Sequence, residues 1–267
     1  MKITATEIYK SIQAIRSGSP VIHNITNYVV MNNTANALLA IGASPVMAHA
    51  QEEVEAMVGI SSALVINIGT LSEHWITAMF MAVRQARKKG IPVILDPVGA
   101  GATAYRTMTA RDLIANEPPA IIRGNASEIM ALSDDTSKTK GVDSADSSDA
   151  AIDAARRLST AHNCVVCVSG QTDYIIEKDQ IIRVKNGHPL MSKVTGLGCT
   201  ASALCGAFAA VEKTNFLAAA HAMVVMGIAG EMAAAKAKGP GTLQVHFLDY
   251  LYCLTRADIS RHLQIED

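Results

Sequence analysis

The sequence predicts an α/β fold in which a central, mostly parallel sheet lies between two layers of helices. Short β-branched or apolar runs alternate with longer helical patterns from one end of the chain to the other, which is typical of a sheet covered by helices on both faces. The chain has 267 residues, 49% of them hydrophobic, and contains no linker rich in Pro, Gly or Ser. We therefore expect a single domain, residues 1–267, built around one large core.

The predicted strands are short apolar runs bounded by turn residues. Six of them are expected at residues 20–23, 45–47, 63–68, 92–95, 120–123 and 164–169. Two further runs, 173–177 and 180–185, are joined at Lys178-Asp179 and predict an antiparallel hairpin added to the same sheet. The sheet is therefore expected to be mixed.

Helical periodicity and end signals predict the elements between the strands. Gly90 is placed to end one of them. After Gly239-Pro240-Gly241, a stripe of apolar residues with helical spacing indicates a C-terminal core helix: Leu243, Phe247, Leu251 and Leu254. The other clear helices are expected at residues 30–41, 72–89, 148–160, 198–211 and 215–238. Residues 133–149, dominated by Ser, Asp, Thr, Lys and Gly, are expected to form a solvated loop.

Charge and composition exclude several classes of partner. The net charge is −1, from 23 basic and 24 acidic residues, so there is no basic surface to follow a phosphate backbone, and we expect no nucleic acid partner. The apolar run 216–230 is too short to span a membrane, which needs about 20 residues. The N-terminus lacks a secretory signal pattern, so we expect a cytoplasmic protein. Cys164 and Cys167 are expected to point to opposite faces of a strand and to pack there.

The most informative local pattern is a glycine turn that leads into a helix of small residues, with a single thiol at the junction. Gly196 and Gly198 can adopt positive φ and let the backbone approach a ligand closely. The first N–H groups of the helix have no partner within it, so a phosphoryl group fits there, next to Cys199. The alternative is a glycine turn that only packs.

Polar residues that directly follow strands are the other candidates, because ligands of open α/β sheets bind beyond the carboxyl ends of the strands. Asp96 follows one strand and precedes a proline, so its carboxylate either faces a metal or phosphate site or caps the next turn. Asn125 and Glu128 have the spacing of a helix capping pair. Arg123 at a strand end indicates that a planar anion is held there, because strands that run into a core rarely carry a guanidinium.

Together these residues resemble the hydroxyethylthiazole kinase family. The resemblance extends from Val21 to about Thr242 and is specific because the motifs occur jointly and in the family's order; residues 133–149 carry no family motif. The motifs are Asn24-Ile25-Thr26-Asn27, Gly42-Ala43-Ser44-Pro45-Val46-Met47, Asp96-Pro97-Val98-Gly99-Ala100, Arg123-Gly124-Asn125-Ala126-Ser127-Glu128, Ser169-Gly170-Gln171-Thr172-Asp173-Tyr174 and Gly196-Leu197-Gly198-Cys199.

The resemblance implies a ribokinase-like α/β/α sandwich and ATP-dependent phosphorylation of 4-methyl-5-(2-hydroxyethyl)thiazole, a salvage step of thiamine biosynthesis. It also implies Mg²⁺ and a homotrimer whose active sites lie between subunits. By the same resemblance, residues of the chain divide into three groups. Those for ATP are Arg123 and Ser169, joined by Gly198 of the predicted phosphate turn; those for the Mg²⁺ and phosphate shell are Asp96 and Glu128; those for the thiazole are Met47 and Gly196, with Asn24 and Asn27 near its pocket.

Cys199 stands where most ribokinase-like enzymes carry Asp, although thiazole kinases resemble this chain. A thiol has an ordinary pKa of about 8.5, which the helix N-terminus is expected to lower. We therefore expect Cys199 to act as a weak base with no covalent role. Two alternatives remain: a related kinase of a pyridine or pyrimidine alcohol, and a hydrolase with Cys199 as nucleophile. The hydrolase needs a His base, and the nearest in sequence, His188, lies in an apparent surface turn.

Overall fold

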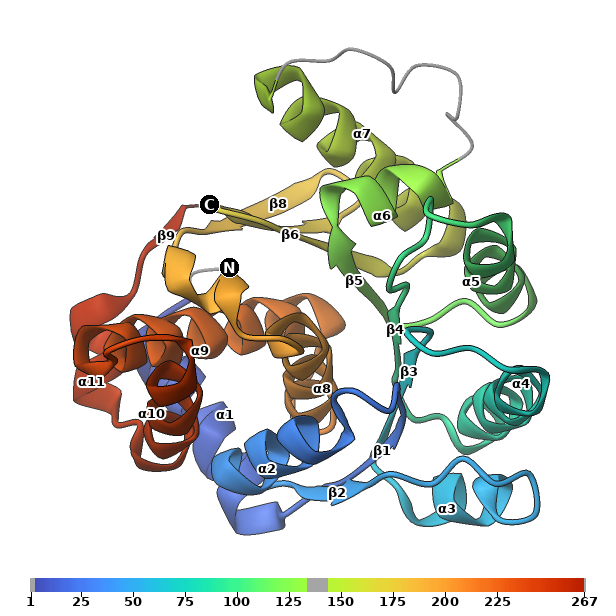
Figure 1. Ribbon diagram of the computed structural model, residues 1–267, viewed down its shortest axis with the longest axis horizontal. Coiled ribbons are helices and arrows are strands. Elements are labelled where there is room, and N and C mark those ends of the chain that lie inside the picture. Colours follow the sequence, from blue (N-terminus) through green and yellow to red (C-terminus); the bar gives the residue numbers. More distant parts are fainter. Residues whose placement is uncertain (1–2, 134–143, 267) are drawn as a thin grey trace.

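A nine-stranded sheet forms the centre of the molecule (Figure 1). The computed structural model describes residues 3–133 and 144–266. The strand order is β2-β1-β3-β4-β5-β6-β7-β8-β9. The bounds are β1 Val21–Ile25, β2 Ser44–Val46, β3 Ala63–Asn67, β4 Val93–Asp96, β5 Ile121–Asn125, β6 Val165–Ser169, β7 Asp173–Glu177, β8 Gln180–Val184 and β9 Ile265–Glu266.

The sheet is mixed, as the sequence predicts. Strands β1 to β6 pair in parallel, and β6 to β9 pair antiparallel. The hairpin of β7 and β8 turns at Lys178, whose φ of 55° lies in the left-handed region. Because β1 pairs with both β2 and β3, the chain changes its direction of travel across the sheet at β1. In open α/β sheets such a switch point is where ligands bind.

Helices cover both faces of the sheet (Figure 1). One layer combines the two ends of the chain, and the other comes from its middle, so two separate apolar clusters form on the two faces. The first layer holds α1 Ala5–Gly18, α2 Met31–Ile41, α8 Leu197–Ala209, α9 Asn215–Lys236, α10 Pro240–Cys253 and α11 Arg256–His262. The second holds α3 Val54–Ile60, α4 Glu73–Lys89, α5 Ala104–Asn116, α6 Ala126–Leu132 and α7 Ser144–His162. A 3-10 helix, η1 Pro189–Lys193, precedes α8.

Every strand and helix expected from the sequence is present, within a few residues at each end, but several elements were not anticipated. These are α1, α3, α5, α11, the 3-10 helix η1 and the two-residue β9. The loop expected at residues 133–149 is wrong over its last part, because α7 begins at Ser144; residues 134–143 lie outside the described chain. Ser and Asp favour loops and helix first turns alike, which explains that error.

The apolar helix α9 is a core element. It has 22 residues and a mean hydropathy of 1.6, so its length and composition alone would let it cross a membrane. However, 83% of its apolar window is buried inside the protein. The stripe predicted on α10 is buried as well. Cys164 and Cys167 are free thiols that belong to the apolar clusters on opposite faces, as strand alternation predicts.

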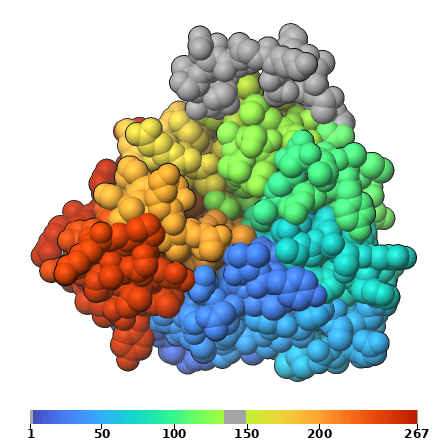
Figure 2. Space-filling model, viewed as in Figure 1, coloured from blue at the N-terminus to red at the C-terminus, as the bar shows by residue number. Residues whose placement is uncertain are grey.

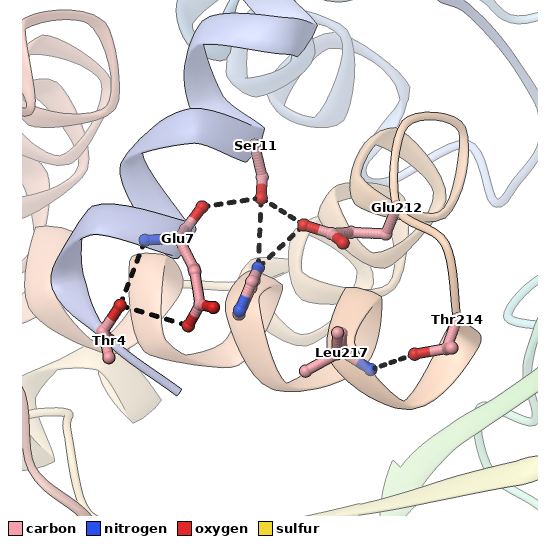
Figure 3. Close-up of polar contacts among 7 residues, drawn as sticks. Thr4, Glu7, Ser11, Glu212, Thr214 and Leu217 are labelled. Atoms are coloured by element: carbon pink, nitrogen blue, oxygen red, sulfur yellow. Dashed lines mark hydrogen bonds and ion pairs between the residues drawn. The ribbon is translucent and has the colours of Figure 1, made fainter. Parts of the chain in front are cut away.

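A buried polar cluster joins α1 to α9 within the first layer (Figure 3). The Ser11 hydroxyl lies 3.0 Å from the Glu7 carbonyl oxygen and also hydrogen-bonds to the Glu212 carboxylate. Nδ1 of His221 lies 2.9 Å from Oε1 of Glu212 and 3.1 Å from Oγ of Ser11. The side chain of His221 is 2% exposed. The cluster therefore connects the N-terminal helix to the turn between α8 and α9.

Candidate active site

Three adjacent parallel strands end in polar residues that face α8. Asn67, Asp96 and Arg123 lie at or near the carboxyl ends of β3, β4 and β5. Each is two residues after an apolar residue that packs into the cluster on the α8 face. Because side chains alternate along a strand, all three point to that same face. The three polar side chains therefore lie together at the carboxyl ends of the strands, on the face that α8 covers.

The first turn of α8 closes that edge. Gly196 precedes the helix with φ 82°, a left-handed conformation that suits glycine. A Cβ at Gly196 would lie 2.6 Å from Cγ1 of Val30, so a side chain there has no room. A Cβ at Gly198 would lie 3.0 Å from Nη1 of Arg123. The N–H groups at the start of α8 therefore lie close to the Arg123 guanidinium. Backbone N–H groups and a guanidinium together are typical of phosphate-binding sites.

A cavity of about 400 Å³ opens between the strand ends and α8. In the space-filling view, the N-terminal, central and C-terminal thirds of the chain meet on this face of the molecule (Figure 2). The cavity is large enough for a small ligand. Its lining residues are Asn27, Val29, Val30, Gly69, Asp96, Val98, Arg123, Asn125, Glu128, Thr195, Gly196, Gly198 and Cys199.

The structure thus brings together seven of the ten residues singled out in the sequence and leaves three outside the lining. Asn24 is buried in β1, where its Nδ2 donates to the Ile22 carbonyl oxygen at 2.9 Å. Met47 is half-buried and packs against the core. Ser169 lies one step behind the cavity, because its hydroxyl accepts a hydrogen bond from Nη2 of Arg123.

A chain of hydrogen bonds runs beneath the cavity. Nδ2 of Asn27 donates to Oδ1 of Asn67 at 2.8 Å, and Nδ2 of Asn67 donates to Oδ2 of Asp96 at 2.8 Å. On the helix side, the Ser202 hydroxyl donates to the same Oδ2 at 2.8 Å. At the other end, Nδ2 of Asn27 lies 3.5 Å from Sγ of Cys199. The loops after β1 and β3, the end of β4 and helix α8 are therefore held in one network.

The Asp96 carboxylate is buried but incompletely paired. Oδ2 accepts two hydrogen bonds, whereas Oδ1 is buried and has no partner among the described residues. Burial raises the pKa of Asp96 to about 6, although the nearby Arg123 guanidinium opposes that shift. A buried acceptor without a partner is costly. Asp96 is also one of the residues that line the cavity, so this incompletely paired carboxylate belongs to the wall of the site.

Glu128 has the capping role considered for it in the sequence. It forms a capping box with Asn125 at the start of α6, in which the Asn125 N–H donates to Oε2 of Glu128 at 2.9 Å. Its other oxygen accepts from the Gly99 N–H at 2.9 Å, which ties the loop after β4 to the helix. Glu128 also lines the cavity. The carboxylate is therefore held rigidly by backbone groups at the edge of the site.

Cys199 is a neutral thiol at physiological pH. Burial raises the pKa of Cys199 to about 11, and the Asp96 charge adds to the shift. The amides of Asn67 and Asn27 act in the opposite direction but are outweighed. The expectation that the helix N-terminus lowers this pKa is wrong, because burial dominates. His188 lies at the start of η1, where Nδ1 accepts from the Leu190 N–H, so it does not serve Cys199 as a base.

The residues present fit a magnesium ion. Within the described ranges there is no group of three His, Cys, Asp or Glu side chains that could form a complete metal cage. Mg²⁺ in phosphoryl-transfer sites is usually held by one or two carboxylates, together with phosphate oxygens and water. The free oxygen of Asp96 and the carboxylate of Glu128 supply that kind of donor set.

Sequence reasoning missed several residues that support the site. Asn67 was placed inside a strand expected at 63–68, whereas β3 ends at Asn67. Had the strand been ended one residue earlier, Asn67 would have appeared as a strand-end amide. Arg106 on α5 carried no signal in the sequence. Its guanidinium donates to the carbonyl oxygens of Val98 and Gly69, both at 2.8 Å, and so holds two loops that line the cavity.

Comparison with solved structures supports the same architecture. A hydroxyethylthiazole kinase protein from Pyrococcus horikoshii OT3 superposes with a TM-score of 0.90 at 39% sequence identity and covers 98% of both chains. A pyridoxal kinase from Staphylococcus aureus, in complex with AMP-PCP and pyridoxal, has a TM-score of 0.67 at 12% identity and covers 92% of this chain and 97% of its own. A ribokinase-like superfamily protein from Enterococcus faecalis V583 has a TM-score of 0.63 at 14% identity and covers 88% of each chain. The last two show a shared ribokinase-like fold.

Sequence comparison identifies the family. Hydroxyethylthiazole kinase from Syntrophus aciditrophicus is 64% identical over 266 residues, 99% of this chain and 98% of that protein. The enzyme of the same name from Leptospira biflexa is 57% identical over 254 residues and covers 95% of both. The model of the hydroxyethylthiazole kinase family matches residues 12–257. These matches agree with the cavity, which is lined by residues from several of the family's motifs. The chain therefore belongs to the hydroxyethylthiazole kinase family.

Proposed function

We propose that this protein is a kinase that transfers the γ-phosphoryl group of ATP to the primary alcohol of 4-methyl-5-(2-hydroxyethyl)thiazole. The product is the thiazole phosphate used in thiamine biosynthesis, so the reaction is a salvage step. The observation that carries the proposal is the cavity itself. There the start of α8 and a guanidinium, which suit a phosphate, lie against a buried carboxylate with a free oxygen. Family membership supports the substrate.

In the proposed reaction, the alcohol oxygen attacks the γ-phosphorus and the bond to the ADP oxygen breaks. The N–H groups around Gly198 and the Arg123 guanidinium stabilise the charge on the transferred phosphoryl group. Ser169 positions that guanidinium through its hydrogen bond. Because the Cys199 thiol holds its own proton, we propose that it mainly orients the alcohol. A loose transition state needs little proton abstraction at the start, so the alcohol proton can leave late, to an oxygen of the transferred phosphoryl group.

Asp96 and Glu128 are the residues that would hold Mg²⁺, with water between them and the metal. Mg²⁺ held there would neutralise negative charge on the phosphate groups. Asp96 is prepared for this role by the two hydrogen bonds to Oδ2, which fix the carboxylate and leave Oδ1 without a partner among the described residues. Glu128 is held by two backbone N–H groups. Both carboxylates therefore need little rearrangement when a metal arrives.

The apolar part of the cavity is the proposed thiazole pocket. Val29 and Val30 line it beside Gly196, and Asn27 supplies a polar contact. Asn24 supports this pocket from β1. Met47 does not line the cavity of one chain, so its proposed contact with the thiazole requires a different subunit.

We also propose that the protein is a cytoplasmic homotrimer of single-domain chains with active sites between subunits. Exposed Tyr28 and Val29, 66% and 61% accessible, lie beside the cavity and support an interface there. Co-folding an inactive Met47 variant with an inactive Cys199 variant tests the shared site, because Asn27 and Cys199 already meet within one chain. Recovered activity supports a shared site; no recovery, or a fully active monomer in sedimentation, contradicts it.

The direct test of the function is a coupled assay of ADP release with a panel of heterocyclic alcohols. We expect turnover that depends on the thiazole alcohol, with one phosphate added to the product by mass spectrometry. Preference for a pyridine or pyrimidine alcohol would assign a related kinase instead. Ester or amide hydrolysis without ATP would assign the hydrolase alternative.

Arg123→Lys tests the nucleotide site. A guanidinium makes paired hydrogen bonds that a single ammonium cannot reproduce. We expect KM for ATP to rise by about tenfold and KM for the alcohol by less. If both constants stay unchanged, Arg123 does not contact ATP.

A further inference from the structure

The buried side-chain amide of Asn67, outside the cavity lining, connects the Asp96 carboxylate to the Cys199 thiol. Asn67 is 1% exposed and is not among the lining residues. It nevertheless hydrogen-bonds to Asp96 directly and reaches Cys199 through Asn27. Residues of the loop after β1, the end of β3, the end of β4 and α8 are thus joined through a single side chain.

Backbone N–H groups lock both amides in one orientation. The Gly69 N–H donates to Oδ1 of Asn67 at 2.9 Å, so the NH₂ group of Asn67 must face Asp96. The Val29 N–H donates to Oδ1 of Asn27 at 3.1 Å, so the NH₂ group of Asn27 must face Asn67 and Cys199. A flipped amide would set an NH₂ group against a backbone N–H. Each amide therefore presents hydrogens, never its oxygen, toward the reacting groups.

This orientation decides which oxygen of Asp96 stays free. Asn67 and Ser202 both donate to the same atom, Oδ2, at 2.8 Å. Oδ1 is left buried and without a partner among the described residues. On the other side, Asn27 shares its two hydrogens between Asn67 and the Cys199 sulfur. The position of Asn67 therefore determines both the rotation of the Asp96 carboxylate and the position of the Asn27 amide beside the Cys199 thiol.

Gly69, in the loop after β3, leaves the space that the Asn27 side chain occupies. A Cβ at Gly69 would lie 2.6 Å from Nδ2 of Asn27 and 2.9 Å from its Cβ and Cγ. Gly69 has no positive φ, so the backbone itself would accept alanine there. The glycine is required by the close approach of the Asn27 amide. This steric observation is independent of the hydrogen bonds and indicates the same contact.

We propose that Asn67 is a positioning residue for phosphoryl transfer, which holds the Asp96 carboxylate and the Asn27 amide beside Cys199 in one fixed geometry. The inference rests on the proposed kinase function. Asn67 touches no ligand, because it lies outside the cavity lining. Its loss should therefore slow the chemical step and leave substrate binding nearly unchanged, since displacement of a catalytic group by about 1 Å can cost about 100-fold in rate.

The test compares the full-length variants Asn67→Ala, Gly69→Ala and Asn27→Ala with Ser202→Ala as a matched control. The control removes the other donor to Oδ2 and leaves the Asn27 amide in place. We expect Asn67→Ala to lower kcat about 100-fold with both KM values within about twofold. Gly69→Ala should also lower kcat, although it removes no polar group. The double variant Asn27→Ala, Asn67→Ala should lose little beyond the worse single variant, because the two residues act in series.

A readout that needs no activity accompanies the kinetics. In ¹H–¹⁵N spectra, the side-chain amide pair that disappears in Asn27→Ala identifies Asn27. We expect this pair to shift or broaden in Asn67→Ala and Gly69→Ala and to stay in place in Ser202→Ala. If Asn67→Ala does not fold, Asn67→Ser is measured in the same way.

Two outcomes would overturn the positioning role: an unchanged Asn27 amide signal in both Asn67→Ala and Gly69→Ala, or a raised KM with kcat intact. If the wild-type protein phosphorylates no alcohol while the amide signals respond as expected, the proposed kinase function fails and the coupling of Asn67 to Asn27 stands. The two failures are therefore distinguishable.

Discussion

The Ser11–His221–Glu212 cluster and the amide chain that ends at Asp96 are both buried polar networks, but their carboxylates behave in opposite ways. Hydrogen bonds from His221 and Ser11 overcome the effect of burial and lower the pKa of Glu212. At Asp96 the balance reverses, and burial raises the pKa to about 6. Each network leaves one buried atom without a hydrogen bond within the described ranges, Nε2 of His221 and Oδ1 of Asp96.

What separates the two networks is the cavity. Asp96 lines it, whereas Ser11, Glu212 and His221 do not. The cluster in Figure 3 connects helices to each other and satisfies its carboxylate with groups of the protein. The network at the strand ends pairs only one oxygen of its carboxylate among the described residues, and that carboxylate lines the cavity. A buried unpaired atom therefore indicates function only where it meets a cavity.

The contrast between the two networks predicts its largest effect on kcat for Asp96→Asn. The amide can still accept from Ser202 and Asn67, but it no longer offers a charged oxygen to the cavity, so we expect kcat to fall by about 10³-fold. Since the folded-state pKa lies above the ordinary value, ionisation of Asp96 costs stability as the pH rises through about 4 to 6. The free energy of unfolding at pH 8 should therefore stay the same or rise by about 1 kcal/mol.

Urea unfolding at pH 5 and pH 8, measured beside kcat, checks both parts of this prediction. An active Asp96→Asn variant would remove Asp96 from the reaction. A variant that is strongly less stable at pH 8 would mean that the network at the strand ends is a structural cluster like the one around His221.

An intermediate effect is expected at Cys199. Cys199→Asp should keep or raise kcat, because a carboxylate is ionised at neutral pH and can accept the alcohol proton, whereas a thiol whose pKa is raised to about 11 stays protonated. Cys199→Ala should lower kcat less than Asp96→Asn does. A folded Cys199→Asp variant without ATP-dependent activity would contradict the placement of residue 199 beside the alcohol. Alkylation of the wild-type thiol by iodoacetamide should accelerate up to about pH 11.

The smallest effect is expected in the cluster around His221. The lowered pKa of Glu212 means that its ionised form stabilises the fold above its ordinary pKa, and that this contribution is lost as the pH falls through the folded-state pKa. Glu212→Gln should therefore lower the free energy of unfolding by about 1 to 2 kcal/mol at pH 7 and much less at pH 3.5. The activity should not change, because the cluster does not line the cavity.

Thr214→Ala is the matched control for that prediction. Thr214 caps α9 next to the cluster, where its hydroxyl accepts from the Leu217 N–H at 3.3 Å (Figure 3). Its loss should cost about 1 kcal/mol at every pH. Thermal unfolding of both variants between pH 3.5 and 7 checks the contrast. Equal pH dependence of the two losses would count against the charge of Glu212.

The sequence was sufficient for the parallel strands and for the residues at their ends, because local rules determine both. Asp96 and Arg123 could be placed from the apolar runs before them, and the Asn125–Glu128 capping pair is present as expected. The sequence was insufficient where the structure depends on contacts between distant segments. The spacing between Asn67 and Asn27 arises only when two loops meet, and the pKa of Cys199 depends on how deeply α8 buries its own first turn.

Helix α1 was missed although the sequence carries signals for it, an N-cap at Thr4 and the apolar stripe of Ile8, Ile12 and Ile15. Helix α3 has only 7 residues, and tertiary packing rather than propensity stabilises helices that short. Strand β9 has two residues and forms only because β8 offers an edge. Ser11, Glu212 and His221 are ordinary polar residues in the sequence, and nothing local indicates that they meet.

The layer that combines both ends of the chain also determines when the enzyme can first exist during its synthesis. Asn27 and Cys199 are separated by 172 residues, which a ribosome takes roughly 10 to 30 s to add at about 5 to 20 residues per second. Until α8 and α9 emerge, the apolar stripe of Ile8, Ile12 and Ile15 on α1 has no layer to pack into. The nascent chain therefore carries an incompletely covered apolar surface until α8 and α9 have been made.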